Sequence, residues 1–320
     1  MAESFASFMA RALHDPQRGY YARRVQDIGA RGDFATSATL SPLLGKGIAL
    51  WLLEERAARP EIRHVIEIGA GNGMLMQTVR QQLGWWHRRR FQWQIVETSA
   101  SLREVQQQRL GSSVSWHDDL KSALADCGGR AFIYHNELLD AFPVRLCEWH
   151  EETWQEVMVD IGPTGVRESL GELNLPTPGC FSALMVKPKQ ARQRVELHES
   201  VRDWLLDWSP AWKSGSMLTV DYGDTFPALY HRRPHGTLRA YLLHQRLEGA
   251  ALYDNIGRQD ITADINFTDY RAWALSLGWQ EWAYGTQTDF ILKRLPKADG
   301  RLLETDGAGT AFKHVIHRCG

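Results

Sequence analysis

Two segments near the N-terminus carry apolar residues at helical spacing. The first predicted helix ends before Pro16, and its apolar face is formed by Phe5, Phe8, Met9, Ala12 and Leu13. Ser41 and Pro42 open a second helix, whose apolar run reaches Leu53. Residues 28–34 between them are too rich in glycine for regular structure. We therefore predict that residues 1–60 form an N-terminal helical cap whose loop acts as a lid.

From residue 61 the pattern alternates between strands and helices. The run from His64 to Ile68 is a short β-branched strand that leads into glycines, and a helix with apolar residues four apart follows. Further strands are predicted at residues 91–96, 114–116, 131–134 and 217–220, and Ser99 is positioned to cap another helix. This alternation predicts an α/β fold with a doubly wound, mostly parallel sheet that collects ligands at the carboxyl ends of its strands.

Two stretches depart from this alternation. Residues 145–215 contain a Gly/Pro-rich segment and an acidic amphipathic helix, and we interpret them as an insertion made of a hairpin plus a helix. Two β-like runs within residues 279–294 predict a closing antiparallel pair at the sheet edge. The core is thus expected at 61–144 and 216–296, with a C-terminal tail at 297–320.

Charge and cysteine content narrow the class of protein. The chain has 37 basic and 38 acidic residues, so no overall field attracts it to nucleic acid or to an anionic membrane. Its four cysteines are scattered and form no Cys-x-x-Cys pair, which argues against a metal site. We expect neither a secretion signal nor a membrane span, because the first residues lack a basic start and no apolar stretch is long enough. We expect a cytoplasmic protein without metal, nucleic-acid partner or membrane insertion, and its oligomeric state is left open.

The strongest chemical signal is a glycine turn between the first strand and its helix. Gly69, Gly71 and Gly73 would bring backbone amides close to a nucleotide-like ligand. A dinucleotide fingerprint requires its third glycine at position 74, which is Met74, so NAD fits less well. Glu67 lies in an apolar strand end, where a cationic ligand such as S-adenosylmethionine would supply a partner for its carboxylate. The alternative is a glycine turn with a surface acid.

Acidic residues also follow the next two strands. Glu97 comes 28 residues after Gly69, where a carboxylate can accept hydrogen bonds from both ribose hydroxyls. Asp118 and Asp119 follow the third strand, where an acid could accept from an adenine amino group. Ordinary strand-end acids are the alternative. Three strand ends that deliver acids to one edge of the sheet nevertheless favour a shared ligand site.

Further motifs are spread along the chain, in the segments 15–21, 32–37, 67–73, 95–97, 136–144, 221–223, 236–241 and 260–263, together with His244 and with Thr286-Gln287. These motifs resemble those of the MidA-like methyltransferases, a family that includes mitochondrial factors methylating an arginine in a subunit of respiratory complex I. The resemblance spans roughly residues 7 to 294. The combination is specific, because each segment matches a different family motif.

This resemblance implies a Rossmann-like class I methyltransferase that uses S-adenosylmethionine and methylates a protein at arginine, with a respiratory-complex subunit as the implied partner. It adds Gly32, Thr36 and Asn136 to the cofactor-binding residues and Asp33 to the catalytic ones. The chain departs from the usual family pattern at Ala38-Thr39, at Lys46 and at Asp264. Because these departures concern the expected substrate side, they leave a non-catalytic assembly protein as the alternative, with a nicotinamide-dependent oxidoreductase less favoured.

Glu137 and Asp140 are the predicted acceptor-side residues. They follow the fourth strand, and a spacing of three would bring both carboxylates to one side of a turn. A guanidinium stays protonated at neutral pH, and two carboxylates could draw its charge away from the attacking nitrogen. The alternative is that one of the two acids caps the following helix. His135 and His244 are weaker candidates for proton transfer, with a structural role as the alternative.

Overall fold

The computed structural model describes residues 2–23, 41–162, 165–176, 178–243, 245–300, 303–304 and 308–320. Within these residues the chain forms two compact units. Unit 1 comprises residues up to 23, 139–204 and 223–273, whereas unit 2 comprises residues 41–138, 205–222 and 274–320. Each unit is described by itself.

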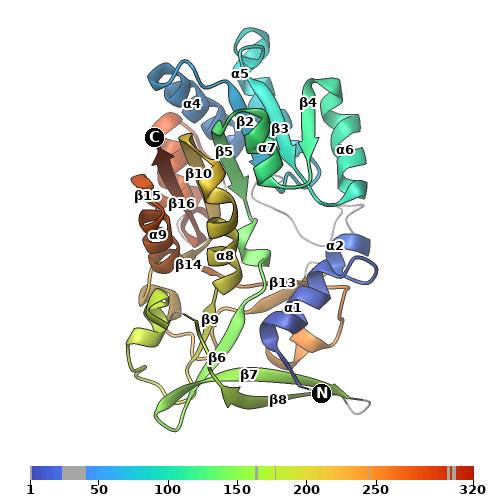
Figure 1. Ribbon diagram of the computed structural model, residues 1–320, viewed down its shortest axis with the longest axis vertical. Coiled ribbons are helices and arrows are strands. Elements are labelled where there is room, and N and C mark those ends of the chain that lie inside the picture. The colour runs from blue at the N-terminus through green and yellow to red at the C-terminus, as the bar shows by residue number, and fades with distance from the viewer. Residues whose placement is uncertain are drawn as a thin grey trace. The chain divides into compact units, whose positions relative to one another are not determined.

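Unit 2 is built on seven strands of an eight-stranded sheet, in the order β15-β16-β10-β5-β2-β3-β4 (Figure 1). The five strands from β10 to β4 are parallel, and β16 and β15 close one edge, with β16 antiparallel to both of its neighbours. Their bounds are β2 His64–Ile68, β3 Gln92–Val96, β4 Val114–His117, β5 Arg130–Asn136, β10 Ser214–Asp224, β15 Gln280–Thr286 and β16 Phe312–Cys319. The predicted parallel α/β sheet with an antiparallel edge pair is confirmed.

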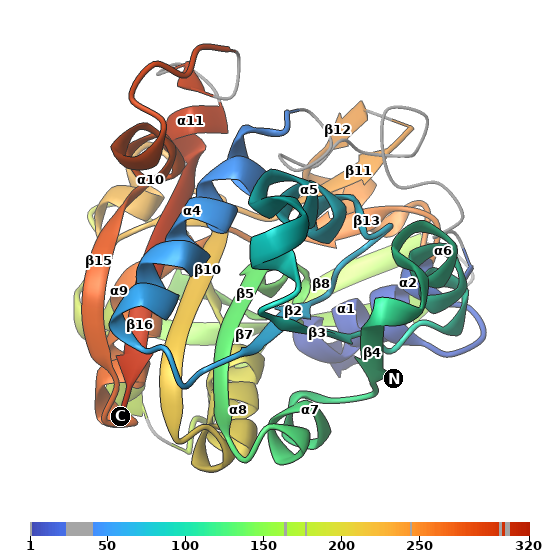
Figure 2. The ribbon, with the colours of Figure 1, turned by 90° about the horizontal axis from the view of Figure 1, so that it is seen from above.

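Helices cover this sheet. They are α4 Leu43–Ala58, α5 Met74–Arg88, α6 Ala100–Leu110, α7 Leu120–Asp126, α10 Gln287–Arg294 and α11 Ala308–Ala311, while α8 Glu199–Trp208 and α9 Phe267–Ser276 run from unit 1 into unit 2. Figure 2 shows α4 and α5 side by side, and their apolar residues share one core with β2, β5 and β10. Ser99 caps α6 as predicted, since its side chain accepts a hydrogen bond from Leu102 N.

The C-terminal region differs from the prediction. Residues 312–319 are no tail: they form β16, which lies inside the sheet between β15 and β10. The second β-like run of 279–294 is instead the helix α10, which Thr286 and Asp289 open with a reciprocal capping box. The antiparallel pair is therefore β15 with β16, because the capped turn at Thr286 ends β15 and starts a helix.

Unit 1 contains two small antiparallel sheets. One has the order β1-β7-β6-β9 with β8 on β7, and the other has the order β12-β11-β13. The strands are β1 Glu3–Ser4, β6 Arg145–His150, β7 Thr153–Gly162, β8 Gly165–Glu172, β9 Arg194–Leu197, β11 Arg239–Leu242, β12 Gln245–Leu247, β13 Asp260–Thr262 and β14 Ile265–Asn266, the last paired with the end of β10. The helices α1 Phe5–His14 and α2 Tyr20–Arg23 also belong here.

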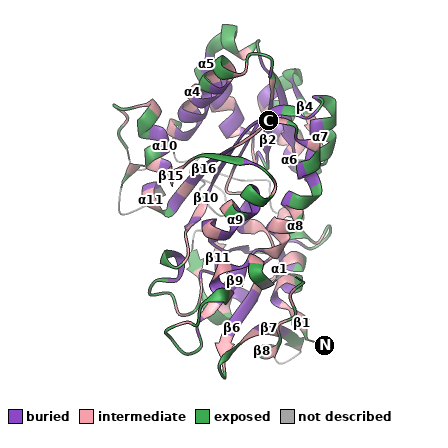
Figure 3. Cartoon of the chain, turned by 60° about the vertical axis from the view of Figure 1, so that its left-hand side comes forward, coloured by how far each residue is buried: buried purple, intermediate pink, exposed green. Residues whose placement is uncertain are grey.

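These units divide the chain differently from the predicted domains. The predicted cap at residues 1–60 is split, because α4 packs Leu44, Ile48 and Trp51 into the core of unit 2. Residues 223–273, expected in the core, belong to unit 1 together with most of the predicted insertion. The strands at the centre of the unit 2 sheet are coloured as buried in Figure 3, which agrees with their continuous apolar sequences.

Candidate functional site

The glycine turn joins β2 to α5 in unit 2. All three of its glycines adopt left-handed backbone, with φ of 65° at Gly69, 54° at Gly71 and 77° at Gly73. Gly73 N donates to Ala70 O over 2.8 Å, and Gly69 N donates to Val96 O over 3.0 Å. Side chains would also be crowded, since a Cβ on Gly69 would lie 2.9 Å from Leu138 Cδ1. The sequence therefore needs glycine for both conformation and close approach.

Glu67 lies at the end of β2 and is only 2 % exposed. The hydroxyl of Tyr134 on β5 donates to its Oε2 over 2.8 Å, so the carboxyl has a partner within the protein. Burial raises the pKa of Glu67 to about 8, and the hydrogen bond from Tyr134 offsets part of that shift. The expectation that a cationic ligand supplies the partner of Glu67 is therefore corrected, because Tyr134 already fills this role. The sequence alone does not show that Tyr134 lies beside Glu67.

Glu97 follows β3 and is 7 % exposed. Its Oε1 accepts from Ser99 N over 3.0 Å, and its Oε2 accepts from Gln106 Nε2 over 3.1 Å. Burial raises the pKa of Glu97, while these hydrogen bonds work in the opposite direction. A carboxylate with two donors keeps acceptor capacity for a pair of hydroxyls.

Gln106 is a site residue that the sequence analysis missed. It is fully buried on α6, and its Nε2 also donates to Gly71 O over 2.8 Å. Its Oε1 accepts from Trp116 Nε1 on β4 over 2.9 Å. One side chain thus joins the glycine turn to Glu97 and β4. The available signal was a glutamine between Leu102 and Leu110, at i, i+4 and i+8 on an otherwise apolar helix face.

The two aspartates after β4 have different surroundings. Asp118 forms an ion pair with Arg103, and its side chain is 86 % exposed. Arg103 Nε also donates to the backbone oxygen of Glu97 over 2.6 Å, so Arg103 connects the ends of β3 and β4. Asp119 caps α7 by accepting from Ser122 N over 2.8 Å. Asp118 remains the predicted adenine residue, whereas Asp119 has a structural role in the helix.

The residues that follow β5, among them the predicted acceptor residue Glu137, lie close to the glycine turn. Asn136 Nδ2 donates to Glu137 Oε1 over 2.9 Å, and Glu137 adopts left-handed backbone with φ of 52°. Asp221 Oδ2 accepts from Leu138 N over 3.1 Å, and Leu138 is the side chain that lies against Gly69. A left-handed non-glycine residue is uncommon, and such residues are concentrated at functional sites.

Asp140 belongs to unit 1, where it is 5 % exposed. Burial raises the pKa of Tyr21, and the charges of Asp260 and Asp140 raise it further. The pKa of Arg239 is lowered by burial and raised by the charge of Asp264, to which Asp140 adds a smaller contribution. Tyr21 donates to Asp260 Oδ1 over 2.9 Å. The side chain of Asp140 thus lies in a buried polar region of unit 1, a position that the spacing from Glu137 did not predict.

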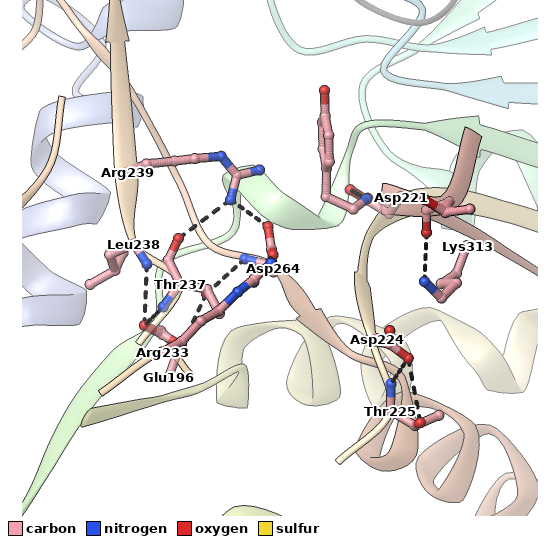
Figure 4. A network of polar contacts seen from close by, with 12 residues as sticks. Glu196, Asp221, Asp224, Thr225, Arg233, Thr237, Leu238, Arg239, Asp264 and Lys313 are labelled. Atoms are coloured by element: carbon pink, nitrogen blue, oxygen red, sulfur yellow. Dashed lines mark hydrogen bonds and ion pairs between the residues drawn. The ribbon is translucent and has the colours of Figure 1, made fainter. Parts of the chain in front are cut away.

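Buried acids hold this part of unit 1 together (Figure 4). Asp264 forms an ion pair with Arg239 and accepts from Arg233 Nη1 over 2.6 Å. Glu196 Oε1 accepts from Thr237 N over 2.7 Å, and its Oε2 accepts from Thr237 Oγ1 over 3.0 Å. Asp264, where the chain departs from the family pattern, thus has its negative charge neutralised by two arginines of the same unit.

Several predicted residues have other outcomes. Gly32, Asp33, Thr36 and His244 lie outside the described residues. His135 is buried and its Nε2 lies 2.9 Å from Thr219 Oγ1, and burial lowers its pKa to about 3, which fits a structural role. Within the described ranges, no group of three His, Cys, Asp or Glu side chains could hold a metal, and no helix is long and apolar enough to cross a membrane.

A family model described as "Putative S-adenosyl-L-methionine-dependent methyltransferase" matches residues 47–283. The chain belongs to this family. The match includes the glycine turn, Glu97 and the end of β5, so the methyltransferase's cofactor is S-adenosylmethionine. The expectation of a family fold and of this cofactor is confirmed, and the oxidoreductase alternative is dropped.

Curated relatives of the chain are about one quarter identical to it. The methyltransferase is 26 % identical over 303 residues to "Protein arginine methyltransferase NDUFAF7, mitochondrial" of Xenopus tropicalis, a match that covers 83 % of this chain and 66 % of the frog protein. It is 26 % identical to the Homo sapiens protein of that name, over 84 % of this chain and 65 % of that protein. The chain thus spans about two thirds of these relatives' length. The prediction of a cytoplasmic location is wrong on this comparison, because the relatives are designated mitochondrial.

A solved structure has the same fold. A Burkholderia thailandensis protein bound to S-adenosyl-homocysteine aligns with a TM-score of 0.87 at 24 % identity, and the alignment covers 99 % of this chain and 88 % of that one. A second structure from the same organism aligns with a TM-score of 0.83 at 23 % identity, over 99 % of this chain and 87 % of the other. These alignments establish the methyltransferase fold over nearly the whole chain.

The residues of unit 2 fit the cofactor of the family. The left-handed glycines keep the turn between β2 and α5 free of side chains, and the N-terminus of α5 follows it directly. The buried carboxyl of Glu97, held by neutral donors, can accept further hydrogen bonds from hydroxyls. We expect the turn to receive the methionine part and Glu97 the ribose.

Proposed function

We propose that this methyltransferase transfers the methyl group of S-adenosylmethionine to an arginine side chain of a protein. The relatives named protein arginine methyltransferases support this acceptor, because they align with more than four fifths of the chain. By the family resemblance, the protein acceptor would be a subunit of a respiratory complex.

Within unit 2, the proposal rests on the position of Glu137. It follows β5 directly and precedes Leu138, whose side chain lies at Gly69 of the cofactor turn. Its carboxyl is oriented by Asn136 Nδ2, and its left-handed φ of 52° turns the chain at this point. An acid fixed one residue from the side chain that contacts the cofactor turn is well placed to meet an acceptor.

An acid at this position would serve the chemistry of methyl transfer to a guanidinium. Bound S-adenosylmethionine supplies an electrophilic methyl group, so the protein's task is to position and desolvate the acceptor. A guanidinium keeps its proton at neutral pH and shares its positive charge among three nitrogens. A carboxylate of Glu137 that accepts hydrogen bonds from two of them would draw the positive charge toward these two and orient the third. The third nitrogen would form the bond to the methyl carbon as the bond from that carbon to sulfur breaks, with S-adenosylhomocysteine as the leaving group and one proton lost from the nitrogen to solvent. Asp140 of unit 1 remains a second predicted acceptor residue.

Methyl incorporation into arginine-containing protein extracts tests this proposal. Glu137→Gln keeps the size of the side chain but removes its charge, and we expect transfer to fall by about two orders of magnitude while binding of S-adenosylhomocysteine is retained. Asp140→Asn tests its predicted role in the same way. Asp207→Asn is the matched control, because this acid of unit 2 is exposed and pairs with Lys121.

The results separate the candidate functions. Methylated arginine in acid hydrolysates of wild-type reactions, lost in Glu137→Gln but kept in Asp207→Asn, supports the assignment. Methylation of another side chain would contradict the arginine acceptor. Full activity of Glu137→Gln and Asp140→Asn would remove both residues from the acceptor site. Cofactor binding without transfer to any fraction of the extract would favour the non-catalytic assembly protein.

A further inference from the structure

A pair of exposed tryptophans marks the far end of α5. Trp85 and Trp86 are 54 % and 61 % exposed, although large indole side chains are usually covered in folded proteins. Gly84 precedes them with φ of 66° and ψ of 175°, a conformation that interrupts the helix. A Cβ at Gly84 would meet no atom within 4 Å, so glycine is needed there for the backbone turn alone.

Arginines surround these two rings. The guanidinium carbon of Arg89 lies 4.1 Å from the centroid of the Trp85 ring, and that of Arg90 lies 5.5 Å from the centroid of Trp86. The two rings themselves are 5.9 Å apart and inclined by 31°. Each exposed indole therefore has a guanidinium beside it, and the two pairs form one surface that is both apolar and positively charged.

The positive charge of this surface is not balanced locally. From Met74 to Val96 the chain has four arginines and no aspartate or glutamate, although the whole chain has a net charge of −1. Other arginines lie nearby: burial, and then the charges of Arg63 just before β2 and of Arg90, lower the pKa of Arg56 on α4. In the part of the chain that the structure describes, Arg63, Arg88, Arg89 and Arg90 form no ion pair.

We propose that Trp85, Trp86 and Arg88 to Arg90 form a docking surface for an anionic phospholipid membrane, which the protein binds peripherally. Indoles partition to the interface between headgroups and acyl chains, and arginines attract the phosphates beside them. A nucleic acid is disfavoured, because a guanidinium already lies over one face of each indole and the basic stretch is short. The membrane would meet the end of α5, roughly 15 Å along the helix from the cofactor turn.

Vesicle binding tests the proposal. The full chain is mixed with vesicles of phosphatidylcholine and phosphatidylglycerol, or of phosphatidylcholine alone, and sedimentation and tryptophan emission are measured. We expect binding to the anionic vesicles that weakens as salt is added. Each arginine near an anionic surface is worth roughly a fivefold change in affinity, so the triple variant R88Q/R89Q/R90Q should bind about a hundredfold more weakly. W85A/W86A should also lose the blue shift of emission.

Trp282→Ala is the matched control. Trp282 is likewise 53 % exposed, and the guanidinium carbon of Arg318 lies 3.6 Å from its ring centroid, but Arg318 pairs with Glu55 over 2.7 Å. Its replacement should leave vesicle binding unchanged, and all variants should still bind S-adenosylhomocysteine, which shows that they fold. The proposal is overturned if anionic vesicles do not bind, if neutral vesicles bind equally, or if Trp282→Ala has the same effect. Binding of polyuridylate, in place of vesicles, with the same dependence on the variants would assign the surface to RNA.

Discussion

The buried acids of the two units are satisfied in different ways. In unit 2, Glu67 and Glu97 at the strand ends accept hydrogen bonds from neutral donors, and burial raises the pKa of both. In unit 1, Asp264 lies between two arginines, which hold its pKa below the usual value despite burial. Both kinds of acid look alike in the sequence, as single carboxylates at strand ends.

This difference separates a structural acid from a ligand-binding acid. Two arginines provide the counter-charge for Asp264, so removal of the aspartate charge leaves a buried cation. A carboxyl held only by a hydroxyl, an amide or a backbone N–H keeps the capacity to accept more hydrogen bonds. We infer that the strand ends of unit 2 are adapted to a ligand with hydroxyl donors, whereas the Asp264 region stabilises unit 1.

The largest expected effect is on the stability of unit 1. Asp264→Asn removes the anion between Arg239, whose side chain is 6 % exposed, and Arg233. We expect the free energy of unfolding to fall by about 3 to 5 kcal/mol, because the buried guanidinium of Arg239 would lose its ion pair with Asp264. Arg233→Ala is the control, since this partner is 48 % exposed and should cost at most about 1 kcal/mol. Urea unfolding that shows equal losses would contradict a structural role for the buried pair.

A smaller effect is expected on cofactor affinity in unit 2. Glu97→Ala removes hydrogen bonds to a charged group worth about 1.5 to 3 kcal/mol, so S-adenosylhomocysteine should bind roughly tenfold to over a hundredfold more weakly. Gln106→Leu should weaken binding less, because Gln106 orients Glu97 and the turn through Gly71. Isothermal titration calorimetry checks both variants. A larger loss in Gln106→Leu than in Glu97→Ala would reverse the assigned roles.

Glu67 should in addition give the protein a pH-dependent stability. Burial raises its pKa from the ordinary value of 4.5 to about 8 in the folded protein. Between these values the unfolded chain releases a proton that the folded chain retains, so the stability contributed by Glu67 is present at low pH and is lost as pH rises toward 8. Relative to Glu67→Gln, the wild type should lose stability across this window. Denaturation curves with the same pH dependence in both proteins would show that Glu67 ionises normally.

Local signals allowed much of the fold to be predicted. The strand from His64 to Ile68, the glycine turn and the Ser99 cap depend on residues close together in the sequence, and each was found where predicted. β16 was missed because polar residues such as His314 and His317 are buried within it, and its pairing with β10 joins residues almost a hundred apart in sequence. The capping box at Thr286 and Asp289 was a readable signal that favoured a helix.

The site residues likewise divide into those that local sequence predicts and those that depend on contacts between distant segments. Glu67 and Glu97 could be proposed because they lie at strand ends at motif spacing. Their partners could not, since Tyr134 meets Glu67 from another strand and Gln106 meets Glu97 only after α6 has folded back on the sheet. The surroundings of Asp140 could not be predicted either, because its charged and polar neighbours Tyr21 and Arg239 lie far from it in the sequence, one on each side.

The central claim is that the glycine turn of unit 2 holds S-adenosylmethionine. Calorimetric titration of S-adenosylhomocysteine into wild type, Gly71→Val and Gly278→Val tests it most directly. Both glycines adopt left-handed backbone, with φ of 54° at Gly71 and 79° at Gly278, so both replacements impose a similar backbone strain. Gly278 is the matched control, because a Cβ there would meet no atom within 4 Å. Binding to wild type and Gly278→Val, but not to folded Gly71→Val, is the predicted result, and wild-type affinity in Gly71→Val would contradict the account.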